Sequence, residues 1–178
     1  MAILKGKVSI VSQVMKVLLI EDNRIEAVQT QGWLKGHDGA FDVDWVDKLN
    51  DGLERISQGG IDIVLLDLNL PDSRGEATFE KLHAEFPEVP IVVLTGEYDD
   101  SIGPATVAKG AQDYLVKQHA DSASLARVLR FALTRHRAQE EKLKELKLAK
   151  TGCVIAMIGA KGGVGTTTTA LNVATALA

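Results

Sequence analysis

Short apolar runs alternate with helix-like segments along the first 120 residues of the chain. The five apolar runs lie at residues 16–20, 41–46, 61–66, 90–94 and 113–116. The first is almost uniformly apolar, which is typical of a strand buried on both faces, whereas the second alternates apolar and polar residues and indicates a strand nearer the sheet edge. The alternation predicts an α/β fold with a doubly wound, five-stranded parallel sheet of the flavodoxin-like order 2-1-3-4-5.

Helical periodicity fills the stretches between these runs. The predicted helices lie at residues 23–36, from Asp47 to the Gly59-Gly60 pair, at 74–86 and at 99–110. Asn23 and Asp47 have side chains that commonly cap a helix N-terminus, and Gly36 is a typical stop. Gly103 and Pro104 interrupt the last of these helices, so we expect that helix to be weak or short.

An extended helix with a heptad pattern is predicted at residues 121–150. Its seam runs through Leu125, Leu129, Ala132, His136, Gln139, Leu143 and Leu146. Steps of four and three are typical of a coiled coil, but two of these positions are polar. Two interpretations stay open, a solvated helix that extends from the domain and a helix that forms a homodimer.

The chain is expected to divide into four parts. These are an N-terminal extension (1–14), an α/β domain (15–120), a helical or coiled-coil linker (121–150) and a C-terminal fragment (151–178). The fragment consists of an apolar strand, a glycine-rich turn and a helical run, in the manner of a truncated βα unit. It contains the single cysteine, Cys153, which we interpret as a buried apolar residue. Met15 looks the more usual start than Met1.

Composition and charge narrow the function classes. The chain has 178 residues and a formal net charge of −4. Nucleic-acid surfaces need clustered Lys and Arg, so this balance argues against such a partner. No apolar run approaches the roughly 20 residues of a membrane-spanning helix, and the N-terminus lacks the features of a secretory signal. We therefore expect a cytoplasmic protein without membrane insertion.

Polar side chains follow four of the predicted strands, where each strand ends. Glu21 and Asp22 follow the first strand, Asp67 the third, Thr95 the fourth and Lys117 the fifth. The carboxyl ends of parallel strands lie at one edge of the sheet, and the crevice at the switch in strand order is where ligands usually bind. We therefore expect these five residues to converge.

This set of residues suits phosphoryl transfer. Clustered carboxylates repel one another, and a divalent cation relieves that repulsion; oxygen ligands favour Mg²⁺. The Asp67 carboxylate can attack phosphorus without first losing a proton, which gives an acyl phosphate. Lys117 supplies a positive donor and Thr95 a neutral hydrogen bond to the phosphoryl oxygens.

Four motifs carry a resemblance to a known family. They are Ile20-Glu21-Asp22-Asn23, Val64-Leu65-Leu66-Asp67-Leu68-Asn69-Leu70-Pro71-Asp72, Leu94-Thr95-Gly96 and Gly110-Ala111-Gln112-Asp113-Tyr114-Leu115-Val116-Lys117. Together they resemble the motifs of bacterial response-regulator receiver domains, over about residues 15–120. One departure is Gln118, because receivers usually have proline after the lysine.

The resemblance implies specific roles. Asp67 would accept phosphate from a histidine kinase or a phosphotransfer protein, and Thr95 and Tyr114 would form the switch pair. Mg²⁺ would be held by Asp22, by Asp67, by the backbone carbonyl of Asn69 and, through water, by Glu21.

The glycine-rich tail resembles a second family. The run from Gly159 to Thr169 is similar to the deviant Walker A loop of ParA/MinD-type ATPases, as found in pilus-assembly proteins of the CpaE/TadZ type. The matching positions, which would bind nucleotide, are Lys161, Gly162, Gly163, Gly165, Thr166 and Thr167. Thr166 stands where the usual second lysine would be. ATP is implied only if a full P-loop domain is present; the alternative is a glycine-rich loop that binds no phosphate in this fragment.

Three functions are compatible with these features. The first is a receiver switch in a two-component phosphorelay, not itself an enzyme, which regulates an attached ParA/MinD-like ATPase module. The second is a P-loop ATPase of pilus-assembly or partitioning type, with the receiver as an interaction platform. The third is a dimer module built through residues 121–150 and indifferent to phosphate.

Overall fold

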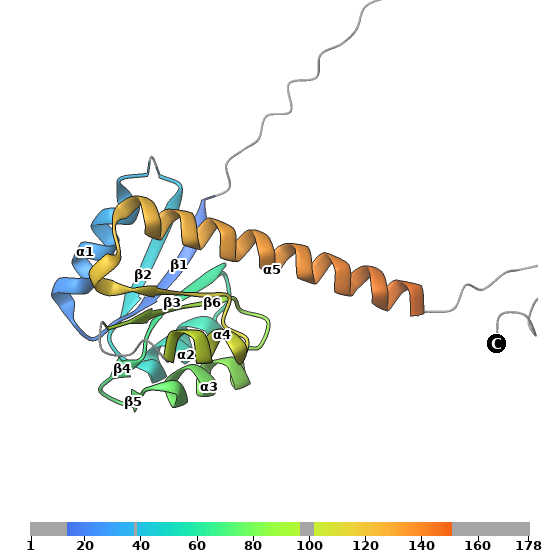
Figure 1. The fold of residues 1–178 in the computed structure, drawn as a ribbon, viewed down its shortest axis with the longest axis horizontal. Helices are drawn as coiled ribbons and strands as arrows, with labels where there is room; N and C mark the ends of the chain where they lie inside the picture. Colours follow the sequence, from blue (N-terminus) through green and yellow to red (C-terminus); the bar gives the residue numbers. More distant parts are fainter. Residues whose placement is uncertain (1–13, 38, 97–101, 151–178) are drawn as a thin grey trace, which may run out of the picture. The chain divides into compact units, whose positions relative to one another are not determined.

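The computed structural model describes residues 14–37, 39–96 and 102–150. Strands and helices alternate through them (Figure 1). The elements are β1 (Met15–Ile20), α1 (Arg24–Lys35), β2 (Phe41–Val46), α2 (Leu49–Ser57), β3 (Ile63–Asp67), β4 (Asn69–Leu70), β5 (Ser73–Arg74), α3 (Glu76–Glu85), β6 (Ile91–Thr95), α4 (Ile102–Ala108), β7 (Asp113–Val116), the 3₁₀ helix η1 (Lys117–His119) and α5 (Ser122–Lys150). The predicted N-terminal extension (1–14) lies almost entirely outside the described residues, and the C-terminal fragment (151–178) lies wholly outside them.

The main sheet is parallel and has the predicted order. Its five strands run β2-β1-β3-β6-β7, which corresponds to 2-1-3-4-5 when the strands of this sheet alone are numbered. A short antiparallel pair, β4 and β5, follows β3. In the register, Asp67 pairs with Leu94 and Thr95 pairs with Val116, the residue before Lys117. The predicted strand ends therefore do lie at one edge of the sheet.

Two apolar layers flank the sheet, and helices cover both of its faces (Figure 1). On one face α1 and α5 pack through residues such as Leu34 and Leu129, and on the other face α2 and α3 pack through residues such as Leu53 and Phe79. Successive side chains of a strand point to opposite faces. All four residues from Val17 to Ile20 are consequently fully buried, which explains the uniformly apolar pattern of this strand.

The predicted caps have different outcomes. Asn23 does cap α1, since its Oδ1 accepts the backbone N–H of Ile25 at 3.0 Å. Asp47 does not cap α2; the N-cap residue is Lys48, which makes no side-chain cap bond. Two of the N–H groups in the first turn of α2 are bound instead by Asp72, whose carboxylate accepts from Leu49 and from Asn50, each at 2.9 Å. The prediction of Asp47 was wrong because a carboxylate from the loop after β4 takes the capping position.

The fourth helix is short, as predicted. α4 spans seven residues, with Gly103 and Pro104 in its first turn, where a missing backbone N–H costs least. Its predicted start at residue 99 falls outside the described residues.

α5 is one continuous helix of 29 residues. Its early seam positions Leu125, Leu129 and Ala132 are buried in the layer over the sheet, so this part of the heptad pattern packs within the domain. The compact unit extends through Glu140, beyond the expected domain end at residue 120. The later seam positions Leu143 and Leu146 are each 52% exposed. Among the described helices, none is both long and apolar enough to cross a membrane.

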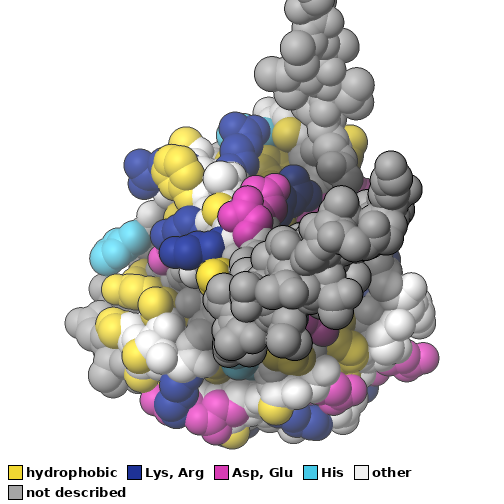
Figure 2. All heavy atoms as spheres, turned by 90° about the vertical axis from the view of Figure 1, so that its right-hand side faces the viewer, with side chains coloured by type: hydrophobic (Ala, Val, Ile, Leu, Met, Phe, Trp, Pro, Cys, Tyr) yellow, Lys and Arg dark blue, Asp and Glu magenta, His cyan; other side chains and the backbone are white. Residues whose placement is uncertain are grey.

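Charges on the surface are mixed and often paired. Figure 2 shows one face on which basic, acidic and apolar side chains are interspersed. Arg55 pairs with Asp44 at 2.6 Å, and Arg135 pairs with Asp113 at 2.9 Å. Exposed pairs of this kind contribute about 0–1 kcal/mol each. They therefore contribute little to the stability of the fold.

Candidate functional site

Three carboxylates gather where β1 and β3 end. Glu21 and Asp22 directly follow β1, and Asp67 is the last residue of β3, the neighbouring strand. One oxygen of each lies within 4.8 Å of the others. Glu21 and Asp67 are buried, whereas Asp22 is exposed and opens the cluster to solvent. The predicted convergence of these acidic residues is therefore present in the structure.

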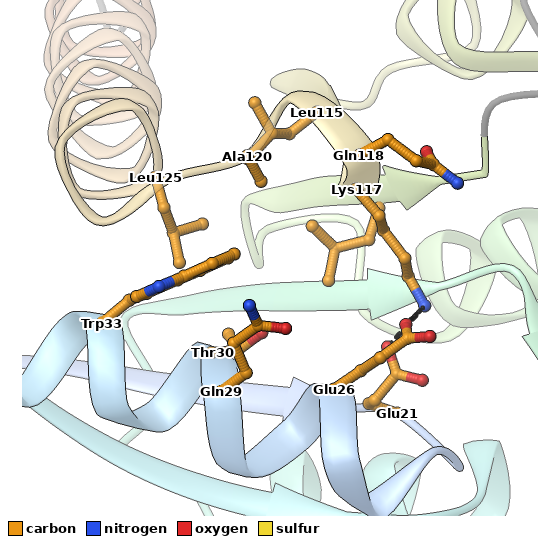
Figure 3. A pocket seen from close by; sticks show the side chains of 11 residues that line it. Glu21, Glu26, Gln29, Thr30, Trp33, Leu115, Lys117, Gln118, Ala120 and Leu125 are labelled. Atoms are coloured by element: carbon orange, nitrogen blue, oxygen red, sulfur yellow. Dashed lines mark hydrogen bonds and ion pairs between the residues drawn. The ribbon is translucent and has the colours of Figure 1, made fainter.

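Lys117 faces this cluster from the end of β7. Its Nζ lies 2.6 Å from Glu21 Oε2 and 3.1 Å from Asp67 Oδ2. A third carboxylate, that of Glu26 in the first turn of α1, lies 2.7 Å away. Figure 3 shows Glu21 and Glu26 both pointing toward the ammonium. Lys117 begins η1 and is joined to Gln118 without a cis peptide bond.

Burial and crowding shape the electrostatics of the cluster. Burial raises the pKa of Glu21 to about 7, and the neighbouring charge of Asp67 adds to that effect, although the Lys117 ammonium opposes it. Burial alone would lower the pKa of Lys117, but Asp67, Glu21 and Glu26 outweigh it and raise that pKa above its usual value. Lys117 is therefore positively charged at neutral pH, and Glu21 holds its proton more tightly than an exposed glutamate does.

The loop after Asp67 is fixed by several hydrogen bonds. The backbone N–H of Asn69 donates to Asp67 Oδ1 at 3.2 Å, so this residue lies beside Asp67, and the role of its carbonyl as a metal ligand stays a prediction. The carbonyl of Leu68 accepts from the N–H of Gly75 at 2.8 Å and from the hydroxyl of Thr78 at 3.1 Å. Asp72, in the same loop, binds the N-terminus of α2. The loop is thus anchored to two helices.

The predicted switch residues lie on adjacent strands. Thr95 is buried at the end of β6, and Tyr114 on β7 is paired in register with Val93. Tyr114 is 36% exposed, and its ring lies against the backbone of Gly103 in α4, where a Cβ would approach the ring carbon Cδ2 to 2.4 Å. Glycine at 103 therefore leaves the space that this ring occupies. The switch role of the pair stays a prediction.

A cavity of about 210 Å³ adjoins the cluster. It lies between α1 and the segment that joins β7 to α5 (Figure 3). Its wall combines apolar side chains with the polar groups of the cluster, including Glu26, Thr30, Trp33, Leu115, Lys117 and Leu125. The Lys117 ammonium thus has the acidic cluster on one side and this cavity beside it.

Sequence reasoning missed two residues that touch the site, Glu26 and Trp45, and one that anchors the loop after Asp67, Asp72. Glu26 was not foreseen as a partner of Lys117, Asp72 was not foreseen as the cap of α2, and Trp45 donates its indole N–H to the backbone carbonyl of Glu21 at 2.8 Å. A signal for Glu26 exists, since it stands three residues after Asn23 in a capping-box pattern. That pattern indicates only a helix start. The residues predicted for nucleotide binding, at positions 161–167, lie outside the described residues.

Comparisons with known proteins agree with this geometry. Residues 17–129, more than half of the chain, match the family described as Response regulator receiver domain. The cell cycle transcriptional regulator CtrA of Caulobacter vibrioides is 31% identical over 147 residues, which are 83% of this chain and 60% of CtrA. The transcriptional regulatory protein DltR of Streptococcus agalactiae is 34% identical over 117 residues, which are 64% of this chain and 50% of DltR. The chain thus spans between half and three fifths of the length of these relatives.

Solved structures share the fold at lower identity. The receiver domain of a putative Luxo repressor protein from Vibrio parahaemolyticus has a TM-score of 0.63 at 23% identity, covering 71% of this chain and 95% of that domain. NtrX from Brucella abortus has a TM-score of 0.65 at 20% identity, covering 89% of this chain and 33% of NtrX. With the family match, the relatives and the clustered acidic residues in agreement, the chain belongs to the response-regulator receiver domain family of two-component signalling.

Proposed function

We propose that Asp67 accepts a phosphoryl group from the phosphohistidine of a kinase or phosphotransfer protein. The observation that carries this proposal is the position of Asp67 between two acidic side chains and the Lys117 ammonium. A carboxylate oxygen of Asp67 attacks phosphorus, the bond from phosphorus to the donor imidazole breaks, and the imidazole keeps its bonding electrons and takes up a proton. The product is an acyl phosphate on Asp67 and a neutral histidine on the donor.

The acidic cluster fits a magnesium ion. It offers only oxygen ligands, its atoms lie within 4.8 Å of one another, and one of its three carboxylates is exposed to solvent. Asp22, Asp67 and the backbone carbonyl of Asn69 are the proposed ligands, with Glu21 acting through water. When bound, Mg²⁺ would neutralise charge on the phosphoryl oxygens and on the cluster.

The remaining polar residues orient the phosphoryl group. Lys117 is charged and lies 3.1 Å from Asp67 Oδ2, so its ammonium can donate to a phosphoryl oxygen after a small shift. The Thr95 hydroxyl is proposed as a second, neutral donor from the neighbouring strand end. Its movement would let Tyr114 change position against α4, which transmits the state of Asp67 to the surface formed by α4 and β7.

Fewer observations support a proposal for the output of the switch. The P-loop-like tail suggests an attached ATPase module of ParA/MinD type, which the receiver would regulate. The relatives CtrA and DltR are transcriptional regulators by name. A homodimer through residues 121–150 is a second candidate, favoured by the exposure of Leu143 and Leu146.

Phosphorylation can be tested directly. The chain is incubated with Mg²⁺ and acetyl phosphate, and the gain of one phosphoryl group is measured by intact mass. We expect wild type to be labelled, Asp67→Asn to be unlabelled, and Asp44→Asn, a matched carboxylate change on β2, to be labelled like wild type. Wild type that gains no phosphate with either acetyl phosphate or a cognate kinase, or full labelling of Asp67→Asn, contradicts the proposal.

A further inference from the structure

The Lys117 ammonium is shared among three carboxylates, and its two hydrogen bonds go to Glu21 and Glu26. A lysine ammonium carries three N–H donors, and three carboxylates surround this one. Nζ lies 2.6 Å from Glu21 Oε2, 2.7 Å from Glu26 Oε2 and 3.1 Å from Asp67 Oδ2. The contact with the proposed phosphoacceptor is therefore the longest of the three. A phosphoryl oxygen on Asp67 would therefore compete for the ammonium with two carboxylates that already hold it more closely.

The contact between Glu26 and Lys117 is the one that can break most easily. The side chain of Glu21 is 1% exposed and also accepts the backbone N–H of Asn23 at 3.2 Å, so releasing its charge would leave a buried, poorly paired carboxylate. The side chain of Glu26 is 40% exposed, so water can solvate it when the ammonium moves away. Figure 3 shows Glu26 reaching across from α1 to Lys117 at the rim of the cavity.

Asn23 holds Glu26 in this orientation. Its Nδ2 donates to Glu26 Oε1 at 2.9 Å, which leaves Oε2 directed at the ammonium. The other end of the same amide, Oδ1, accepts the N–H of Ile25 and caps α1. The first turn of α1 is thereby tied to the end of β7.

We propose that Glu26 is a positioning residue that draws the Lys117 ammonium toward α1 and competes with the phosphoryl group for it. This inference rests on the proposed function of Asp67. Glu26→Gln removes the charge and keeps the size of the side chain, so Lys117 becomes freer to bind a phosphoryl oxygen. Because a partly exposed ion pair shifts an equilibrium by roughly two- to fivefold, affinity for a phosphoryl mimic should rise by that factor.

The test uses beryllofluoride, a mimic of the phosphoryl group, at saturating Mg²⁺. Binding is followed by tryptophan fluorescence, since the Trp45 indole is bonded to the backbone of Glu21. Glu76→Gln is the matched control, because Glu76 also lies in the first turn of a helix, also pairs with a lysine, Lys109, and is 37% exposed. The Mg²⁺ affinity of each variant is measured separately.

We expect Glu26→Gln to bind beryllofluoride about two to five times more tightly than wild type. Its Mg²⁺ affinity should not rise, because Glu26 is not one of the clustered carboxylates. Glu76→Gln should match wild type in both measurements. If Glu26→Gln binds beryllofluoride no more tightly than wild type, or if Glu76→Gln shows the same gain, the inference about Glu26 is wrong. The proposed function of Asp67 is not affected by that result. Wild type that binds no beryllofluoride overturns the proposed function, and the inference with it.

Discussion

Glu21 should lower the stability of the domain as the pH rises toward neutrality. In the unfolded chain its carboxyl has the ordinary pKa of 4.5, whereas burial and the charge of Asp67 raise that pKa to about 7 in the fold. The folded state therefore binds the proton more tightly. A group of this kind stabilises the fold at low pH, and the contribution is lost as the pH rises from 4.5 to about 7.

The size of the effect follows from the pKa difference. Ionising Glu21 in the fold costs about 3 kcal/mol when the pH is above both values, because each pKa unit corresponds to about 1.4 kcal/mol. Near pH 5 the cost is below about 1 kcal/mol. Glu21→Gln keeps the shape and removes the titration, so the variant should gain about 2–3 kcal/mol over wild type between about pH 5 and pH 8.

The assay is urea unfolding followed by tryptophan fluorescence, with EDTA present to remove metal ions. Titrating groups that lie far from Glu21 cancel when the variant is compared with wild type at each pH. Glu54→Gln, in an exposed part of α2, is the matched control for the substitution itself. A stability difference for Glu21→Gln that stays constant with pH, or that moves in favour of wild type as the pH rises, refutes the reasoning. Mg²⁺ added at about pH 8 should narrow the difference, because it pairs the ionised carboxylate.

Two further predictions concern the supports of the site. Asp72→Ala removes the cap of α2 and should lower the free energy of unfolding by about 1–2 kcal/mol. Asp51→Ala, at an exposed position of α2, should lower it by less. Equal losses for the two variants in urea unfolding would contradict the capping role. Gly103→Ala places a Cβ 2.4 Å from the Tyr114 ring and should cost about 1–3 kcal/mol. That cost should largely disappear in a Tyr114→Ala background, and an undiminished cost in this double-mutant cycle would show that the ring is not the obstacle.

The sequence predicts the sheet and the core of the site well because both depend on local signals. Strand ends are marked by the change from apolar to polar residues, and parallel strands bring those ends to one edge. Asp22, Asp67 and Lys117 could therefore be placed together without coordinates. Asp22 and Asp67 follow adjacent strands, and the long side chain of Lys117 reaches Asp67 from β7, with β6 between the two strands.

Other features depend on tertiary contacts that no local pattern records. Asp47 and Asp72 are equally suitable caps by residue type, and only the path of the loop after β4 brings Asp72 to α2. Glu26 fits a helix-start pattern, yet the position of α1 beside the end of β7 brings it to Lys117. The heptad pattern of α5 likewise does not say whether Leu129 packs on a partner helix or on its own sheet, and the structure shows the sheet.

The position of the phosphoryl group is the most direct test of the central claim. The protein is phosphorylated with Mg²⁺ and acetyl phosphate or a cognate kinase, the acyl phosphate is trapped by borohydride reduction, and the modified residue is identified by peptide mass spectrometry. We expect reduction at residue 67 and at no other carboxylate. A modified residue elsewhere in the chain, with Asp67 intact, would contradict it.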